Sequence, residues 1–444
     1  MRIGIYAEVR SQQGGTFRYT VTFLEMLRAL DLDDEFVVLH RRKTDLPMTA
    51  LIGGAWSQAT LPSGVMDVVQ DMGVAIVGEQ FARRVWYYAT RLHPSSVVLT
   101  SKGEPRFDRL GGRWYRDRRM DFVVYPVYSV KAFETRVASV VTVHDLNHRV
   151  YTEFPEVRAL GEFERREYYF SNVCRSALTV FVESETGRED LLEYYADTGL
   201  DGDRVVVLPM LPASTVKPGV SPGERARVRE RYGLSGDYLF YPAQFWPHKN
   251  HLRLVEALSL LKQDAGLTPT LVLGGSYSGA LRRRTFATAM RAARRLGVDR
   301  QVRHLGFIPD EDMSALYSAA VGLVMPTFFG PTNIPVLEAF AVGCPVVTSD
   351  IRGIREQTDG GAILVDPRNP EAIADGLRRL LTSNDMRTGL IRRGREVLSR
   401  YTSQDYRRIL KQALQDTKVR VGQRLSSVHS ARPGPGSRTL QSRL

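Results

Sequence analysis

The chain has 444 residues with 61 Lys and Arg against 49 Asp and Glu, a formal net charge of +12. Its 43% hydrophobic and 25% charged residues are typical of a globular protein and exclude global disorder. Two cysteines are too few for a disulfide framework, so we expect a reducing, cytoplasmic location. No apolar run approaches the roughly 18 residues that would span a bilayer. The length suits two domains or three small ones.

Short β-branched runs alternate with helical patterns, which predicts an α/β protein with parallel sheets and crossover helices. The opening MRIGIYAEVR indicates a first strand and not an export signal. We expect strands at 2–6, 36–39, 122–125, 140–143, 179–182, 205–208, 238–241, 270–273, 302–305, 322–325, 345–347 and 362–364. Helices are expected at 17–30, 188–195, 250–262, 310–319 and 335–341.

Two such series require two sheets and therefore two domains. The proline-rich stretch 209–224 separates them and is typical of a linker. We therefore expect an N-terminal domain at 1–208, a C-terminal domain at 225–402, a final helix at 403–416 and a flexible tail at 417–444.

The positive charge is concentrated in three places. The tail, 417–444, carries six basic residues and no acid, half of the excess charge. Two further arginine clusters lie at 282–300, on an expected helix, and at 106–119, where Trp114 and Tyr115 are interleaved. Each cluster suits either a solvated surface or attraction to anionic lipid or an anionic acceptor. No nucleic-acid module accompanies them, so we expect no nucleic-acid partner.

Ligands of open parallel sheets lie beyond the carboxyl ends of the strands. After the first strand, Gly14 and Gly15 precede a helix, where backbone amides and the helix dipole favour a phosphate; a tight turn is the alternative. In VTVHDLNH, His144 and Asp145 follow a strand and suit contact with a sugar hydroxyl or an acceptor. A metal site that includes His148 and a structural histidine capping a helix are the rivals.

Two segments in the second half of the chain also place candidate ligand-binding residues just after a strand. In YPAQFWPHKN, Lys249 precedes a helix, and its ammonium group beside a helix N-terminus suggests a diphosphate; a solvated lysine is the alternative. In MPTFFGPTNIPVLEAFAVGCPVV, the amides of 332–334 suit phosphate and sugar oxygens. Glu338 lies in an apolar stretch of that helix, where a carboxylate needs partners. A ribose diol or an ion pair would supply them.

These segments resemble glycosyltransferase family 4, retaining enzymes of the GT-B fold. PAQFWPHKNH, VRHLGFIPDEDMSALYSAA and FFGPTNIPVLEAFAVGCPVV resemble its C-terminal domain, and GG-x-x-RY, VTVHDLNH and VFVESETGREDLLEYY its N-terminal domain. The resemblance covers about residues 1–415. It implies two Rossmann-like domains facing a central cleft, with the final helix crossing back to the N-terminal domain. It also implies sugar transfer from a nucleotide diphosphate without a metal or other cofactor.

The resemblance implies roles for individual residues. Glu338 matches the second glutamate of the family's Glu-x7-Glu motif, which binds the donor ribose. Lys249 matches the lysine that neutralises the leaving diphosphate, Gly15 the glycine whose amide approaches it, and His144 the histidine beside the donor sugar. The predicted donor-binding set is Gly14, Gly15, Gln244, Lys249, Thr332, Asn333, Ile334 and Glu338, with His144 and Lys249 as the catalytic pair.

Two positions depart from the family. Gly330 stands where the first glutamate is expected, and Gln244 where an arginine is expected. The resemblance to a branch with an FGPTN-type loop makes both a subgroup pattern, in which Thr332 and Asn333 take over the donor-sugar contacts and Lys249 carries more of the charge. A catalytically inactive member of the family is the alternative.

The resulting prediction is a metal-independent retaining hexosyltransferase, with mannosyl transfer as one option. Its donor is GDP- or UDP-linked, and its acceptor is a glycan, a polysaccharide precursor or a lipid-linked molecule. It acts in the cytoplasm, in solution or at the inner face of an anionic membrane. A sugar-nucleotide epimerase of the same fold and a non-catalytic membrane- or nucleic-acid-binding protein that uses its basic tail are the competing hypotheses.

Overall fold

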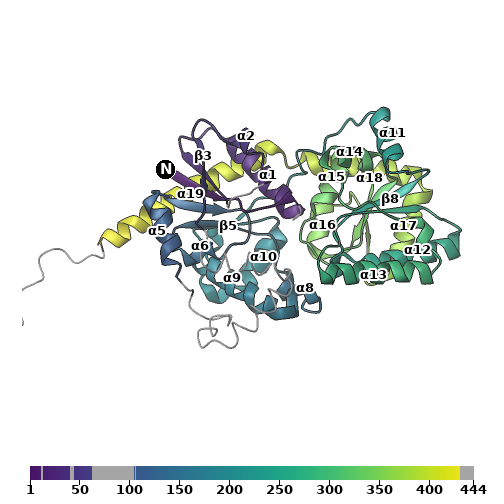
Figure 1. The fold of residues 1–444 in the computed structure, drawn as a ribbon, viewed down its shortest axis with the longest axis horizontal. Coiled ribbons are helices and arrows are strands. Elements are labelled where there is room, and N and C mark those ends of the chain that lie inside the picture. Colours follow the sequence, from purple (N-terminus) through teal and green to yellow (C-terminus); the bar gives the residue numbers. More distant parts are fainter. Residues whose placement is uncertain (12–13, 41–44, 63–104, 106, 431–444) are drawn as a thin grey trace, which may run out of the picture.

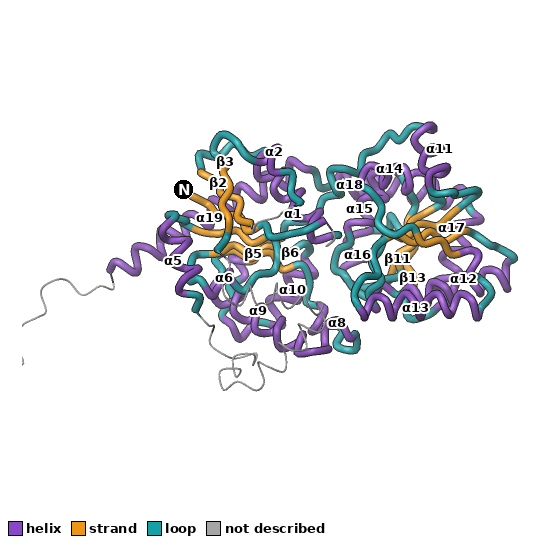
Figure 2. Tube along the Cα trace, in the orientation of Figure 1, coloured by secondary structure: helices purple, strands orange, loops and turns teal. Residues whose placement is uncertain are grey.

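The structure is a computed structural model that describes residues 1–11, 14–40, 45–62, 105 and 107–430. The described residues form two α/β domains, each a parallel sheet with helices on both faces (Figures 1 and 2). This confirms the predicted fold class. None of the described helices is both long and apolar enough to cross a membrane.

The N-terminal domain contains a seven-stranded sheet in the order β3-β2-β1-β4-β5-β6-β7. Its strands are β1 Arg2–Tyr6, β2 Glu35–His40, β3 Trp56–Thr60, β4 Phe122–Tyr125, β5 Ser139–Val143, β6 Thr179–Val182 and β7 Val205–Val207. Its helices are α1 Gly15–Arg28, α2 Met48–Leu51, α5 Arg109–Asp117, α6 Lys131–Glu134, α7 Asn147–Val150, α8 Pro155–Arg158, α9 Glu162–Ser176 and α10 Glu185–Tyr194.

The C-terminal domain contains a six-stranded sheet in the order β10-β9-β8-β11-β12-β13. Its strands are β8 Tyr238–Pro242, β9 Thr270–Gly274, β10 Val302–His304, β11 Gly322–Met325, β12 Val346–Ser349 and β13 Ile363–Val365. Its helices are α11 Pro222–Arg231, α12 His251–Ala265, α13 Ala280–Arg295, α14 Asp310–Ala319, α15 Ile334–Val342, α16 Arg352–Thr358, α17 Pro370–Thr382 and α18 Asn384–Ser399.

The strand order places one topological switch point in each sheet. It lies between β1 and β4 in the N-terminal domain and between β8 and β11 in the C-terminal domain. Ligands of doubly wound sheets bind at such points, beyond the carboxyl ends of the strands. Gly14–Gly15 follows β1, Lys249 lies after β8, and Thr332–Asn333 lies after β11. The topology therefore puts three of the four candidate segments at switch points.

Every strand expected from the sequence is present, with its ends shifted by two residues or less. The edge strand β3 was missed because its segment, WSQAT, is short and polar, and three of its side chains are exposed. The linker prediction was too long. Helix α11 begins at Pro222 inside that stretch, where Ser221 and Glu224 form a reciprocal capping box.

The largest difference concerns the C-terminus. Helix α19 spans Ser403–Ser430, so residues 417–430 are helical, where we expected a flexible tail; residues 431–444 lie outside the described residues. Polar anchors hold this extension on the N-terminal domain. Thr417 is buried and its hydroxyl lies 2.7 Å from that of Thr179, Lys418 pairs with Asp34, and Arg420 donates to the Leu178 carbonyl oxygen. Because these contacts are made by polar side chains, the sequence of this segment shows no apolar periodicity.

Helix α19 also contributes apolar side chains to the core of the N-terminal domain, among them Tyr406, Leu410 and Leu414. We therefore expect Leu414→Ala to lower the free energy of unfolding of the transition that includes the N-terminal sheet by about 2–5 kcal/mol, because it leaves a cavity. Urea unfolding measures this. The exposed neighbour Gln415→Ala is the control and should change it by less than about 0.5 kcal/mol. Equal effects would show that α19 is not packed into this core.

Candidate functional site

His144 lies directly after β5, at the carboxyl edge of the N-terminal sheet. Its Nδ1 is 2.6 Å from Oε1 of Glu183, and its Nε2 is 2.9 Å from the carbonyl oxygen of Pro126. Both partners are acceptors, so a doubly protonated imidazolium satisfies both contacts. Burial lowers the pKa of His144, but Glu183, Asp145 and the Pro126 carbonyl together outweigh it and raise the pKa above its usual value. These contacts therefore favour the charged form of His144 and hold its ring in a fixed orientation.

Glu183 joins the two domains at this point. It follows β6, is 4% exposed, and accepts hydrogen bonds from His144 through Oε1 and from the Thr332 hydroxyl through Oε2. Thr332 belongs to the loop after β11 of the other domain. Glu183 was not predicted, although the rule that singled out His144, a polar residue just after a buried strand, applies to it equally.

Lys249 and Asn333 meet at the switch point of the C-terminal sheet. Lys249 closes a short 3-10 helix, Pro247–Lys249, and its Nζ lies 3.5 Å from Oδ1 of Asn333. Burial lowers the pKa of Lys249 to about 8, although the carboxylates of Asp145 and Glu156 act in the opposite direction. Both carboxylates come from the N-terminal domain, so the charges of that domain act on a lysine of the C-terminal domain.

The N-terminal end of α15 is less open to a ligand than the sequence suggested. The backbone N–H of Asn333 donates to Oε1 of Gln357 at 3.0 Å, and Nε2 of Gln357 donates to the Asn333 carbonyl oxygen at 3.0 Å. The Ile334 side chain is buried against the core of the N-terminal domain. A ligand must therefore compete with Gln357 for the Asn333 amide.

Gly14 and Gly15 lie where α1 begins. Gly14 has φ 65°, a backbone conformation that glycine adopts without strain. A Cβ atom there would lie 3.6 Å from Nε2 of Gln244, so this turn meets the loop after β8. At Gly15 a Cβ would meet no atom of the described chain within 4 Å, which leaves space over the first turn of α1.

Gln244 is in turn held by Arg282 of α13. Its Oε1 accepts from Nη1 of Arg282 at 2.7 Å and from Nε1 of Trp246 at 3.1 Å. The Arg282 guanidinium also lies 4.8 Å from the Trp246 ring centroid, a cation–π distance. A positive charge therefore lies next to the position where the resembling family has an arginine of its own.

Of the two partners that the sequence allowed for Glu338, a ribose diol or an ion pair, the structure shows the ion pair. Its side chain is fully buried, with Oε1 2.8 Å from Nη1 of Arg18 and Oε2 2.7 Å from the Tyr317 hydroxyl. Arg18 lies on α1, three residues after Gly15, and also donates to Asp310 at 2.9 Å. Burial raises the pKa of Glu338, although Arg18 and Tyr317 oppose this. Arg18 and Tyr317 were not predicted as site residues.

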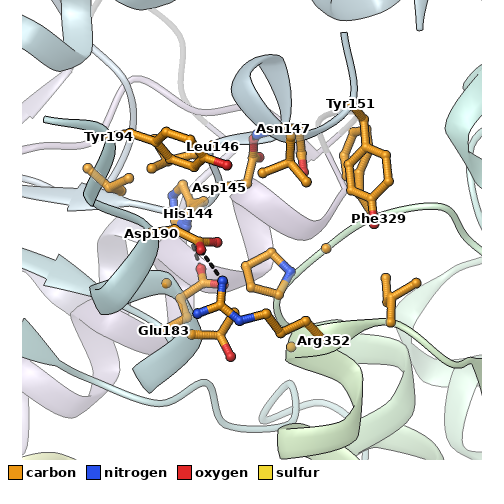
Figure 3. A pocket seen from close by; sticks show the side chains of 18 residues that line it. His144, Asp145, Leu146, Asn147, Tyr151, Glu183, Asp190, Tyr194, Phe329 and Arg352 are labelled. Carbon is orange, nitrogen blue, oxygen red and sulfur yellow. Dashed lines mark hydrogen bonds and ion pairs between the residues drawn. The ribbon is translucent and has the colours of Figure 1, made fainter. Parts of the chain in front are cut away.

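A cavity of about 120 Å³ lies beside His144, between the domains. Figure 3 shows His144, Glu183, Asp190 and Arg352 gathered on one side of it, with Tyr151 and Phe329 together on another. Its lining comes from the loop after β5, from α10, from the loop after β11 and from the start of α16. Thr332, Lys249, Gly15 and Glu338 are not among its lining residues. The structure thus places His144 in a cavity of its own and Glu338 with α1.

Further polar contacts join the domains around this cavity. Glu356 of α16 accepts from the backbone N–H groups of Glu185 and Thr186 at 2.9 and 3.1 Å, at the N-terminus of α10. Arg352 pairs with Glu189 and Asp190. Helix α16 is therefore held against α10 of the other domain.

The metal alternative fails on geometry. His144 bonds Glu183, whereas His148 is fully buried and bonds Glu167 at 2.7 Å, on the side of α9. Within the part of the chain that the structure describes, no group of three or more His, Cys, Asp or Glu side chains could hold a metal ion.

The pKa of His144 depends on Glu183, so we expect Glu183→Gln to lower it toward its usual value of 6.5. NMR titration of the His144 ring measures this shift. The stabilisation from the charged pair is fully present below the unfolded-state pKa and is lost as the pH rises through the higher folded-state pKa. Asp190→Asn is the control, because Asp190 lines the same cavity but bonds Arg352. An unchanged titration in Glu183→Gln would contradict this account.

Sequence comparisons match part of the chain. The sequence profile of the family described as "Glycosyl transferases group 1" matches residues 225–397. The chain is 28% identical over 257 residues to the O-antigen chain mannosyltransferase B of Escherichia coli, covering 58% of this chain and 64% of that protein. It is 31% identical over 246 residues to the D-inositol 3-phosphate glycosyltransferase of Frankia alni, covering 53% and 56%. The matched part is thus less than two thirds of either relative.

Solved structures match along nearly the whole chain. Anabaena HepE in complex with UDP and glucose aligns with a TM-score of 0.65 at 16% identity, over 94% of this chain and 99% of that one. WaaG, a glycosyltransferase of lipopolysaccharide biosynthesis, aligns with a TM-score of 0.63 at 16% identity, over 93% and 98%. At this identity the likeness concerns the fold. The chain has the GT-B fold of two Rossmann-like domains facing a central cleft.

Proposed function

We propose that this protein is a retaining glycosyltransferase of family 4, in the subgroup with an FGPTN-type loop. It moves a sugar from a nucleotide diphosphate to a hydroxyl group of a glycan, a polysaccharide precursor or a lipid-linked acceptor. The observation that carries this is the half-buried Lys249 ammonium beside Asn333 at a topological switch point, where an anion restores the charge that burial disfavours. The matches to glycosyltransferases support the same conclusion.

The diphosphate is proposed to lie between Lys249 and the first turn of α1. The space over Gly15 admits a phosphate to the amide end of that helix, whose dipole favours an anion. Glu338 lies near the same helix through Arg18. An ionised carboxylate has about four acceptor sites, so Glu338 can accept from a ribose hydroxyl beside its bonds to Arg18 and Tyr317.

Arg282 is proposed to supply the charge that Gln244 lacks. Gln244 contacts the Gly14 turn on one side and Arg282 on the other, so the guanidinium lies one side chain away from the proposed phosphate site. The donor-binding set then consists of the predicted residues together with Arg18, Arg282 and Tyr317. Thr332 and Asn333, from the loop after β11, contact the donor sugar.

The proposed reaction is a front-face displacement at the anomeric carbon. The bond from that carbon to the diphosphate oxygen breaks, the bond to the acceptor oxygen forms, and the acceptor proton passes to the departing phosphate oxygen. Lys249 and the amides of α1 stabilise the charge that develops on the diphosphate, and each such donor is worth about 2.7–4 kcal/mol. Glu183 is held by His144 and Thr332, so it positions the cationic His144 beside the sugar and does not attack it.

Two donors, GDP-mannose and UDP-glucose, are the ones we test. The E. coli relative is named as a mannosyltransferase, and HepE was solved with UDP. We propose hexosyl transfer and compare GDP-mannose with UDP-glucose as donors by thermal shift, with and without EDTA. Binding of one donor should raise the melting temperature in proportion to occupancy, equally in EDTA. Transfer to an acceptor hydroxyl, with retention at the anomeric carbon, completes the test. Product formed from donor alone, or no donor binding, would refute the proposal.

Lys249 gives the donor site a distinctive pH dependence. Its ammonium is charged below its pKa of about 8, so affinity for a nucleotide sugar should be constant there and fall up to tenfold per pH unit above it. Lys249→Met should weaken binding about 10- to 100-fold and abolish the break near pH 8. Calorimetric titration from pH 6 to 10 measures both.

The exposed lysine of α12, Lys262→Met, is the matched control and should keep the wild-type affinity and the break. A wild-type pH profile that is flat through pH 9, or an identical one in Lys249→Met, would remove Lys249 from the diphosphate site.

Arg282 is tested by moving the charge. Arg282→Gln should weaken donor binding about fivefold, because the attraction between a nearby cation and the proposed diphosphate contributes on the order of 1 kcal/mol. Adding Gln244→Arg to this variant returns a guanidinium to the family position and should restore the affinity. Arg283→Gln, an exposed neighbour on α13, should change nothing. Failure of the second change to restore binding would show that Arg282 acts by packing on Trp246.

A further inference from the structure

The end of the N-terminal domain away from the C-terminal domain carries a surface that the proposed reaction does not use. It is built by α5, α6, the end of α9 and the last turns of α19 (Figure 1). We call it the end surface and define it by Phe107, Leu110, Arg113, Arg136, Arg175 and Arg424. All six side chains are exposed.

Two apolar side chains of this surface are exposed. Leu110 is 82% exposed and Phe107 is 43% exposed. Phe107 precedes helix α5. Leu110 lies on α5, whose opposite face is fixed, with Tyr115 buried and a Cβ at Gly112 only 2.4 Å from the carbonyl oxygen of Thr135. The outward direction of Leu110 is therefore set by close packing behind the helix. An exposed leucine alone means little, but Leu110 follows three residues after Phe107, which lines a hollow together with arginines, and the two suit an amphipathic partner.

The hollow next to Phe107 has a volume of about 300 Å³. Three arginines line it, Arg136, Arg175 and Arg424, from three different elements, and none of its described lining residues is an acid. The Arg136 guanidinium lies 3.2 Å from the Phe107 ring centroid, so ring and cation form one unit. Three guanidinium groups around one hollow suit a phosphate group.

Two carboxylates of the α5 segment, Asp108 and Asp117, are already paired, Asp117 with an arginine of the end surface itself. Asp108 accepts from the Gly111 backbone N–H at 2.7 Å and faces Lys131 at 3.8 Å, which fixes the start of α5. Asp117 pairs with Arg113 at 3.7 Å. The six residues that define the end surface include four arginines and no acid.

We propose that the end surface docks the protein on an anionic phospholipid bilayer. A lipid phosphate enters the hollow between Arg136, Arg175 and Arg424, and Leu110 and Phe107 insert at the level of the headgroups. A nucleic acid would satisfy the arginines but offers nothing to Leu110, which is why the bilayer fits better. The docking names a partner for the proposed transferase and rests on that proposal only for its purpose, because a lipid-linked acceptor would lie in the same bilayer. It does not depend on which sugar is transferred.

Sedimentation with liposomes tests the docking on the full chain. Vesicles of phosphatidylcholine with 30 mol% phosphatidylglycerol should bind the protein at low salt and release it at high salt, and pure phosphatidylcholine vesicles should not bind it. Each arginine near an anionic surface is worth about fivefold. The double variant Arg175→Glu with Arg424→Glu should therefore bind at least about 25-fold more weakly, and Leu110→Asp about tenfold more weakly.

The control makes the same charge change on the other domain, with Arg379→Glu and Arg393→Glu on α17 and α18, and should lose less than fivefold. A loss equal to that of the end-surface pair would reduce the effect to net charge and overturn the proposal. Changing Arg432, Arg438 and Arg443 to Gln should retain most of the binding. Loss of all binding there would overturn it too.

Two further outcomes would also overturn it. Liposome binding that is unaffected by Leu110→Asp, with equal binding to heparin, would mean a polyanion site without a membrane role. Equal binding to neutral and anionic vesicles would exclude phosphate recognition. Donor binding, measured on the same variants by thermal shift, should stay unchanged, so that a failure of the docking is distinguishable from a failure of the proposed transfer.

Discussion

The architecture of the cleft depends on one desolvated carboxylate. Glu338 has no contact with solvent, and an unpaired charge in that position would cost several kcal/mol. Its partners come from both domains, Tyr317 from α14 and Arg18 from α1, at 2.7 and 2.8 Å. Arg18 in turn bonds Asp310 at the start of α14. The start of α1 is therefore held against the C-terminal domain by a buried charge, and the Gly14–Gly15 turn comes with it.

Carboxylates also join the two domains on the other side of the cleft. Glu183 and Glu356 each accept hydrogen bonds from the opposite domain, and Glu156 of α8 does so from the His248 backbone at 2.9 Å. Carboxylates that cross an interface specify one relative position of the two halves, because a shift of an ångström leaves them unpaired. Arg352, by contrast, is more than half exposed and adds little to this.

The sequence predicts what depends on local patterns. The strands, the position of Gly15 after β1 and that of Lys249 after β8 follow from runs of apolar residues and from the rule about strand ends. The Arg282 contact to Gln244 and the Arg18 contact to Glu338 join segments 38 and 320 residues apart, and no spacing encodes them. The end of α19 was not predicted for a different reason: apart from Val421, which is buried in the core, polar contacts fix it, so its sequence resembles that of a solvated tail.

The loop after β11 shows why glycine, and not the glutamate of the resembling family, fits position 330. Gly330 has φ 126°, and a Cβ there would lie 2.9 Å from Nδ2 of Asn333, so a glutamate at this position would strain the backbone and displace Asn333. Gly353 allows Pro331 to pack so closely that a Cβ would come within 2.5 Å of it, and Gln357 holds both backbone groups of Asn333. Glycine at position 330 is therefore compatible with a loop in which Oδ1 of Asn333 lies 3.5 Å from Nζ of Lys249, and it brings no carboxylate to that switch point.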